Sequence, residues 1–412
     1  MAISLKNKNV LISGASIAGP ALAFWLQRYG FTVTVMEQAP GLRVGGHKID
    51  IRGKTTDIVK KMGLYEKIQH SSADIKTASF VSEEGKKTVE MPADFLGMRE
   101  PNDVELLRAD LSRILYESTC NSCEYIFNDA IKSVKQDDQE VKIDFVKSPS
   151  RKFDLLVGAD GFHSSVRSLV FGKESHFSHN LGDYYVAIYS MENYLNLDRS
   201  EIFYSSMNKL ASIGNTKGCQ NAQAQFIFRS SELNYDYRDI QQQKDILSKM
   251  YANDGWEIPI LLGAMDKAPD FYFDTVRQIR MDTWSKDRTI LIGDAAYCPC
   301  LASGQGASMA LVGAYVLAGE LFVALGDHKI AFVEYEKEMK AFVKTNQQLG
   351  EMVMRQMVPK SERWIQSAMN KLISSLPFLQ TFFIKKLRKQ FLYAANCIHL
   401  KDYEVIAAKI DY

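Results

Sequence analysis

The strongest constraint on the fold is a glycine-containing turn near the start of the chain, between a predicted strand and a predicted helix. Val10-Leu11-Ile12 has the unbroken apolar pattern of a strand that is covered on both faces. Residues 14–19 form the turn, and apolar residues then recur at helical spacing until Gly30 ends the helix. Residues 31–36 have the pattern of a second strand, so the first 37 residues predict a βαβ unit.

The turn differs by one residue from the glycine fingerprint of dinucleotide-binding proteins. Gly14 allows the tight turn, Gly19 allows close packing of helix on sheet, and Ser16 is small enough for a pyrophosphate to approach. Ala18 and the N-terminus of the helix that begins at Gly19 offer backbone N–H groups to phosphate oxygens. Glu37 ends the second strand, where an acidic side chain accepts hydrogen bonds from ribose hydroxyls. We therefore predict a site for the adenosine half of FAD or NAD; the alternative is a tight turn without a ligand.

Two later apolar runs end in similar turns that contain an acidic residue. Leu155-Leu156-Val157 leads to Asp160, and Ile290-Leu291-Ile292 leads to Asp294. A further glycine-rich turn, with glycines at positions 304 and 306, opens a helix whose N–H groups would face a second portion of the ligand. These repeated turns favour FAD over NAD.

The remaining pattern divides the chain into three parts. Residues 77–98 and 184–273 contain shorter strands, such as 184–189 and 224–228, that are typical of an antiparallel sheet. We predict an α/β fold with a discontinuous Rossmann-like FAD-binding domain (1–76, 99–183 and 274–343), an inserted β-rich substrate domain (77–98 and 184–273) and a C-terminal helical extension (344–412). The extension carries apolar stripes through Trp364 and Phe382 and a basic run at 385–389. We expect its apolar face to brace the two domains; the alternative is contact with a membrane surface.

Composition excludes several classes of protein. The 50 basic and 49 acidic residues are interspersed, without the positive excess of a nucleic-acid-binding protein. The uncharged stretch from Ala307 to Gly319 is too short to span a bilayer, and no secretory signal is evident. Cys120 and Cys123 lack a second pair or a histidine at zinc-ligand spacing, so we expect reduced thiols and no metal. A cytoplasmic monomer is the expectation.

At these three motifs the chain resembles the class A flavoprotein monooxygenases of the para-hydroxybenzoate hydroxylase fold. The resemblance covers roughly residues 8–345, with the family's Asp-Gly motif at Asp160 and its Gly-Asp motif at Asp294. Within that family, the chain is most similar to the tetracycline-inactivating enzymes, or tetracycline destructases. Residues 45–53 resemble their Gly-Gly-x-x-x-Asp segment, which implies that Asp50 faces the flavin, and residues 294–299 and 344–348 also resemble members of this group.

The resemblance implies a mechanism and a set of cofactor contacts. Asp294 would bind the ribityl chain of a tightly bound FAD, and Arg108 would contact the flavin. NADPH would visit transiently, and the reduced flavin would add O2 to form a C4a-hydroperoxide that transfers one oxygen atom to the substrate. The cofactor supplies this chemistry, so no catalytic side chain is assigned. Arg43 and Arg52 are candidates for attracting the NADPH phosphates, whereas His47 and His163 are expected to be surface or hydrogen-bonded histidines.

The substrate is expected between the flavin and the β-rich domain, and it would be aromatic or polycyclic, with tetracyclines implied by the resemblance. Phe226, Phe228 and Arg229 are candidates for the wall and a charged anchor, although both phenylalanines could equally be ordinary sheet packing. Phe203 aligns where some family members have a glutamine facing the drug, and Pro299 follows the Gly-Asp motif. The alternatives are a hydroxylase of another phenolic or polyketide-like compound, a non-oxygenating FAD oxidoreductase such as a prenyl reductase, or a non-enzymatic dinucleotide sensor. A halogenase is disfavoured because Trp256-Glu257-Ile258-Pro259 supplies only half of the halogenase motif.

Overall fold

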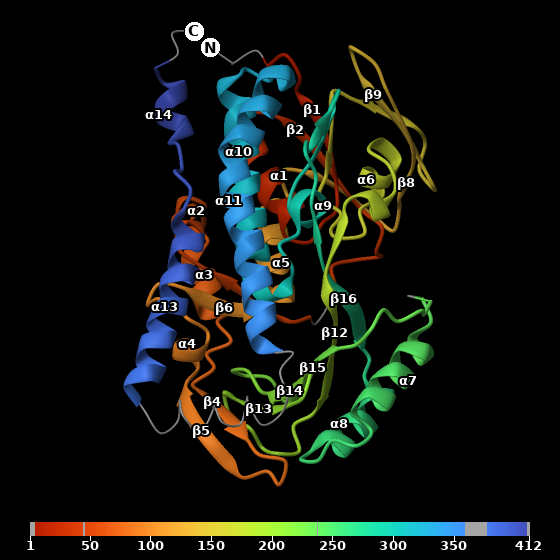
Figure 1. The fold of residues 1–412 in the computed structure, drawn as a ribbon. Helices are drawn as coiled ribbons and strands as arrows, with labels where there is room; N and C mark the ends of the chain where they lie inside the picture. Colours follow the sequence, from red (N-terminus) through yellow and green to blue (C-terminus); the bar gives the residue numbers. More distant parts are fainter. Residues whose placement is uncertain (1–4, 44–45, 237, 359–376, 410–412) are drawn as a thin grey trace.

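The computed structural model describes residues 5–43, 46–236, 238–358 and 377–409. Figure 1 shows a mostly parallel sheet in the upper part of the molecule and a larger antiparallel sheet in the lower part. Long helices α10 (Gly306–Val323) and α11 (His328–Met357) run beside the parallel sheet, and α11 reaches down toward the antiparallel one.

The three apolar runs of the sequence become neighbouring strands of the upper sheet. β18 (Thr289–Leu291), β11 (Leu155–Gly158) and β1 (Asn9–Ser13) pair in parallel, and every residue of β11 and β18 is buried. The sheet continues on one side with β2 (Thr32–Glu37) and β7 (Glu124–Phe127), also parallel, and on the other with the antiparallel β17 (Ser285–Lys286). The expected doubly covered parallel sheet is confirmed.

The helix α10 is the centre of the upper part. It contacts α1 (Ala18–Arg28), α2 (Lys54–Lys61), α11 and α14 (Tyr403–Ala407). By length and composition this helix could cross a membrane, but 83% of its residues are buried inside the protein, as in the core helix of a globular domain. Other helices of this part are α3 (Tyr65–His70), α5 (Arg108–Glu117), α6 (Ser165–Val170) and α9 (Asp294–Tyr297), whereas the short α4 (Ala93–Leu96) packs on the hairpin of the lower sheet.

The lower sheet has seven strands. In order they are β16 (Tyr272–Ile279), β12 (Ser178–Glu192), β15 (Asn221–Arg229), β14 (Lys209–Gly214), β13 (Ser200–Ser206), β4 (Thr77–Val81) and β5 (Lys87–Pro92). Because β4 pairs in parallel with β13, a hairpin from early in the chain completes this sheet. The helices α7 (Ile240–Tyr251) and α8 (Ile258–Ala264) cover one face, and the other face turns toward the upper part.

The other strands form two small sheets. β3 (Lys48–Ile51) pairs with β6 (Val104–Leu107), and β8 (Ile131–Gln136), β9 (Val141–Phe145) and β10 (Arg151–Phe153) form a three-stranded meander. Short 3-10 turns lie at Glu174–His176, Met265–Lys267 and Leu301–Ser303. The β3–β6 pair matters most for function, because it begins immediately after the segment at Gly46.

The C-terminal part folds back onto the upper domain. Residue 344 lies inside α11, so that helix continues through the predicted start of the extension. In α13 (Pro377–Asn396), Phe391 and Ala394 pack with residues of α11 and with Met98, which is the position expected of a brace. Lys385, Lys386 and Lys389 are exposed. Trp364 and the side chain of Phe382 lie outside the described residues.

Candidate functional site

The phosphate turn is built by close packing that only glycine permits. Gly14 follows β1 with φ +111°, and its N–H donates to the carbonyl of Met36 at 2.7 Å. A Cβ at Gly14 would lie 2.4 Å from the Ala159 carbonyl oxygen, and one at Gly19 would lie 1.9 Å from the Gly14 carbonyl oxygen. The turn therefore leads directly into α1, whose first residue is Ala18. Backbone N–H groups at this helix N-terminus can bind a phosphate.

Glu37 stands beside this turn at the end of β2. Its carboxylate accepts hydrogen bonds from the backbone N–H of Ala15 at 2.9 Å and of Ala39 at 3.0 Å. Two backbone donors thus fix the orientation of the carboxylate, which keeps further lone pairs for other donors. This geometry suits the recognition of ribose hydroxyls.

Arg108, at the start of α5, brings a positive charge to the same turn. Its guanidinium donates to Ser16 Oγ at 3.2 Å, and Ser16 Oγ lies 3.3 Å from Ser112 Oγ. The guanidinium therefore lies at the phosphate end of the predicted site, where a charge-assisted hydrogen bond to a phosphate is favourable. Partly buried His47 lies close by, and burial, followed by the charge of Arg108, lowers the pKa of His47 to about 4.

The Asp160-Gly161 turn is held in place by hydrogen bonds to the start of α6. Both carboxylate oxygens of Asp160 accept hydrogen bonds from the start of α6, including the backbone N–H groups of Ser165 and Val166. Fully buried Arg167 then donates to the carbonyl of Phe162 and, at 2.8 Å, to that of Ala295. The Asp-Gly turn is thereby tied to α9, which carries the Gly-Asp motif.

Asp294 is the first residue of α9 and is enclosed by the protein. Burial raises the pKa of its carboxyl group, and the charge of Arg108 and the Cys298 thiol act in the opposite direction. Gly306, the first residue of α10, faces it: a Cβ at Gly306 would lie 3.8 Å from Asp294 Oδ1. Asp294 therefore lies near both Arg108 and the start of α10.

Asp50 lies beside the glycine-rich turn that contains Gly304. A Cβ at Gly304, where φ is +62°, would lie 3.5 Å from Asp50 Oδ2. Asp50 also forms an ion pair with Arg52 at 2.8 Å, and Ser308 Oγ donates to its backbone carbonyl at 3.2 Å. Because Arg52 is only 4% exposed and already paired, the expectation that it attracts the NADPH phosphates is corrected. Arg43 is exposed.

The space between these segments fits FAD. A Cβ would meet nothing within 4 Å at Gly161, and only the Arg108 Cβ, at 3.7 Å, at Gly46. Gln305, which precedes α10, is fully buried, yet neither atom of its carboxamide has a hydrogen-bond partner. Free space beside glycines, and a buried amide without a hydrogen-bond partner in the protein, are both expected where a polar cofactor lies against the chain. Ser16 and Arg108 would hold the pyrophosphate, Glu37 the ribose, and Asp294 the chain between pyrophosphate and flavin.

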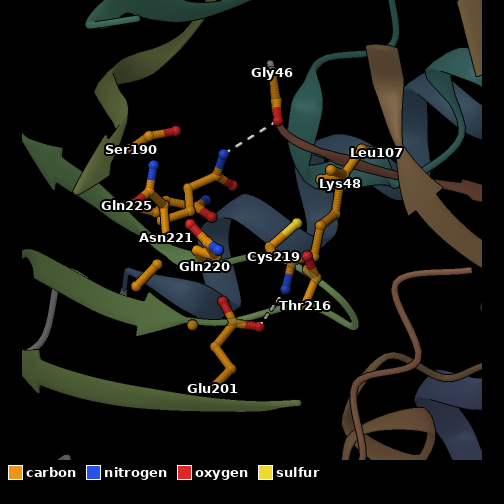
Figure 2. Close-up of a pocket in the computed structure, with 13 residues that line it drawn as sticks. Gly46, Lys48, Leu107, Ser190, Glu201, Thr216, Cys219, Gln220, Asn221 and Gln225 are labelled. Carbon is orange, nitrogen blue, oxygen red and sulfur yellow. Dashed lines mark hydrogen bonds and ion pairs between the residues drawn. The ribbon is translucent and has the colours of Figure 1, made fainter. Parts of the chain in front are cut away.

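A second cavity, of about 380 Å³, lies between the β3–β6 pair and the lower sheet. Figure 2 shows Gly46, Lys48 and Leu107 on one side and the polar side chains of the sheet on the other. The cavity is lined by Gly46, Lys48, Leu107, Ser190, Glu201, Gly214, Thr216, Cys219, Gln220, Asn221, Ala222, Gln223 and Gln225. It adjoins the cofactor segments through Gly46, whose carbonyl accepts a hydrogen bond from Gln223 Nε2 at 3.1 Å.

The predicted substrate wall is corrected in part. Phe226 and Phe228 are fully buried on the other face of the sheet, where they pack under α7 and α8, for example against Tyr251. Side chains alternate along a strand, so Gln223 and Gln225 of β15 face the cavity instead. The polar residues at 221, 223 and 225 recur with the period of a strand, which separates the two faces of β15 in the sequence but does not tell which face meets a ligand.

The other predicted substrate-binding residues lie in different places. Phe203 pairs with Ser212 on the cavity-facing side of the sheet and stacks on Phe80, with ring centroids 5.3 Å apart. Arg229 ends β15 opposite Tyr184, outside the cavity lining. Pro299 is buried, and its carbonyl accepts a hydrogen bond from Gln278 at 3.0 Å. Sequence reasoning did not select the polar lining residues, above all Lys48 and Glu201.

His163 lies on the Asp-Gly turn and is exposed, as expected. It hydrogen-bonds Glu174 at 3.0 Å and Asp274 of β16 at 3.4 Å. These two contacts, that with Asp274 first, raise the pKa of His163 to about 9. All six cysteines are free thiols.

Comparison with known proteins agrees with this geometry. The family model described as "FAD binding domain" matches residues 7–349. A flavin-dependent monooxygenase from an unknown prokaryotic organism is 39% identical over 358 residues, which are 87% of this chain and 92% of that protein. A flavin-dependent monooxygenase of Legionella longbeachae serogroup 1 (strain NSW150) is 38% identical over 87% of this chain and 91% of its own length.

A solved structure is similar over nearly the whole chain. The crystal structure of the tetracycline destructase Tet(55) superposes with a TM-score of 0.84 at 36% identity, and covers 97% of this chain and 99% of that one. The motifs, the cofactor space and the relatives lead to one conclusion: the chain belongs to the family of FAD-binding flavin-dependent monooxygenases, and it is structurally similar to the tetracycline destructases.

Proposed function

We propose that this monooxygenase uses NAD(P)H and O2 to insert one oxygen atom into a polycyclic substrate, and that tetracyclines are among its substrates. The observation that carries the proposal is the cavity of about 380 Å³ beside Gly46, because it lies next to the segments that fit FAD. Its size lies at the lower end of the range usual for small-molecule sites. The similarity to Tet(55) supports tetracyclines as the first compounds to test.

The protein's own contribution is binding and orientation. The FAD supplies the electron transfer and the activation of O2 when it is bound. The stacked pair Phe203 and Phe80 offers an aromatic surface on the cavity-facing side of the sheet, and Gln225 offers both a donor and an acceptor.

The test is substrate-dependent turnover by the purified holoenzyme. We expect a yellow protein whose oxidation of NADPH or NADH, and whose O2 uptake, both rise when tetracycline is added. Mass spectrometry should find a product with one added oxygen atom. The variant Asp294→Ala should retain less FAD and lose this activity in proportion.

Two results would change the proposal in different ways. FAD-loaded protein that oxidises NADPH without any response to tetracycline would remove tetracyclines, and a panel of phenolic and polyketide-like compounds would be tested next. Oxidation of NADPH that yields only hydrogen peroxide, with unchanged substrate, would contradict oxygen insertion itself.

A further inference from the structure

We infer that the cavity selects a neutral or zwitterionic, oxygen-rich ligand through hydrogen bonds and rejects aromatic carboxylates, because its single ammonium group is already neutralised by the protein. This inference rests on the proposed function, since it names the substrate class of the same site. It concerns the polar lining residues; Lys48 lies within the Gly-Gly-x-x-x-Asp segment, and the other polar lining residues lie on the lower sheet and its loops, outside the recognised cofactor motifs.

The charged side chains that line the cavity neutralise each other. Of the described residues that line it, Lys48 and Glu201 are the only ones that carry a full charge, and their side chains are 18% and 14% exposed. The Lys48 ammonium is paired directly with the Glu201 carboxylate and lies 4.0 Å from Glu105 Oε1 (Figure 2). Burial acts to lower the pKa of Lys48, but the two carboxylates outweigh it and the pKa is raised, so Lys48 remains protonated.

The pair continues into a buried chain of alternating charges. Glu105 Oε1 lies 3.1 Å from Arg99 Nη1, which lies 3.4 Å from Asp50 Oδ1, and Asp50 is paired with Arg52. Three cations therefore face three carboxylates from the cavity to the cofactor segment, and Arg99 also pairs with the exposed Asp94 carboxylate at 2.8 Å. No cation of this network is left over for a ligand, and an unpaired carboxylate brought into the cavity would lose its hydration without gaining a counter-ion.

Glu201 is held as part of the wall. Its Oε1 accepts a hydrogen bond from Ser212 Oγ at 3.2 Å. A Cβ at Gly214 would lie 3.1 Å from Glu201 Cγ, so the bare glycine makes room for the glutamate across the sheet. Position 214 consequently contributes no side chain, and no cation, to the cavity.

The rest of the lining can bind groups of either hydrogen-bonding type. Four carboxamides, at positions 220, 221, 223 and 225, each offer donors and an acceptor. Ser190 Oγ donates its proton to Asp270, which leaves its lone pairs for a donor on the ligand. Such a surface matches a ligand edge on which hydroxyl, keto, enol or amide groups alternate.

The experiment compares two probes of nearly the same shape on the FAD-loaded enzyme: salicylate, which is an anion, and salicylamide, which is neutral and carries an amide in place of the carboxylate. Dissociation constants are measured from the change in the flavin absorbance spectrum, which needs no turnover. The wild type should bind salicylamide more tightly than salicylate. Glu201→Gln leaves Lys48 without its direct partner, so the ratio of the salicylate to the salicylamide dissociation constant should fall by roughly tenfold or more.

The double variant Lys48→Met/Glu201→Gln restores a neutral cavity and should return the ratio to its wild-type value. It also keeps the inference testable if Glu201→Gln alone does not fold. Glu257→Gln is the matched control, because Glu257 bonds Tyr194 away from the cavity lining and should leave the ratio unchanged.

The inference is overturned if the wild type prefers salicylate, if it binds neither probe, or if the ratio is the same in all four proteins. Failure of the proposed function is distinguishable from these results. In that case tetracycline would stimulate no O2 uptake, while the ratio of the two probes would still respond to Glu201→Gln.

Discussion

At the scale of single residues, Arg108 is the side chain that brings positive charge to the phosphate turn. Its contact with Ser16 Oγ, at 3.2 Å, places it where the pyrophosphate of FAD would lie. We expect Arg108→Ala to weaken FAD binding by roughly tenfold to a hundredfold, since a hydrogen bond to a charged group contributes about 1.5–3 kcal/mol. Quenching of FAD fluorescence during titration of the apoprotein measures this.

A control for this prediction lies on the same helix. Arg113 of α5 is exposed and pairs with Asp110 and Glu117. Arg113→Ala should therefore leave the FAD dissociation constant unchanged. Equal effects of the two substitutions would show that Arg108 acts through the stability of α5 and not through the phosphate.

His163 gives a prediction about pH. Hydrogen bonds that the ring donates to Asp274 and Glu174 raise its pKa to about 9 in the folded protein, against about 6.5 in an unfolded chain. A raised folded pKa means that the contribution to stability is complete below about pH 6.5 and is lost as the pH rises through about 9. The Tm of His163→Gln should thus lie below that of the wild type at pH 6 and converge with it above pH 9.

The control is Gln69→Ala, at an exposed position on α3, because this substitution removes no titratable group. Its Tm difference from the wild type should be the same at pH 6 and at pH 9. A Tm difference for His163→Gln that grows with pH would contradict the charged pairing.

At the scale of elements, the helix α10 packs so closely that one of its glycines has no room for a methyl group. A Cβ at Gly319 would lie 2.1 Å from Tyr403 Cδ2 of α14. We expect Gly319→Ala to destabilise the protein by about 1–3 kcal/mol, the usual result of overpacking, although alanine favours helix. In α8, Gly263 is exposed and a Cβ there would meet nothing within 4 Å, so Gly263→Ala should stabilise by roughly 0.5–1 kcal/mol. Urea unfolding of both variants compares the signs, and the same sign for both would refute the packing argument.

The elements also show how far sequence reasoning reaches. The parallel strands were predictable, because both faces of β11 are buried and its sequence is apolar without interruption. The substrate wall was not, because both faces of β15 are covered: Phe226 packs under helices, while Gln225 faces the cavity. Alternation separates the two faces but does not say which one meets the ligand. Local pattern likewise could not reveal that Lys48 meets Glu201, 153 residues later in the chain.

At the scale of the whole molecule, the two halves are joined by more than an interface. The chain passes from the upper part into the lower sheet and back twice, once for the hairpin of β4 and β5 and once for the segment from β12 to β16. A buried cluster also combines Ile227 of the lower sheet with Met354 of α11, and the Lys48–Glu201 pair crosses between β3 and β13. Domains that share only a small polar interface move and unfold separately, and this arrangement opposes that behaviour.

We therefore expect FAD to stabilise the whole protein although its predicted contacts lie in the upper part. Free FAD at a hundred times its dissociation constant adds about 2.7 kcal/mol to a protein that binds it only when folded. Calorimetry should show one unfolding transition that moves upward as a unit, and the fluorescence of Trp25 in the upper part and Trp256 in the lower part should change at the same temperature. In Arg108→Ala the same FAD concentration should produce a smaller shift. Two transitions, of which FAD raises only one, would mean that the buried cluster and the ion pair do not couple the halves, and that the substrate cavity can open without loss of the cofactor site.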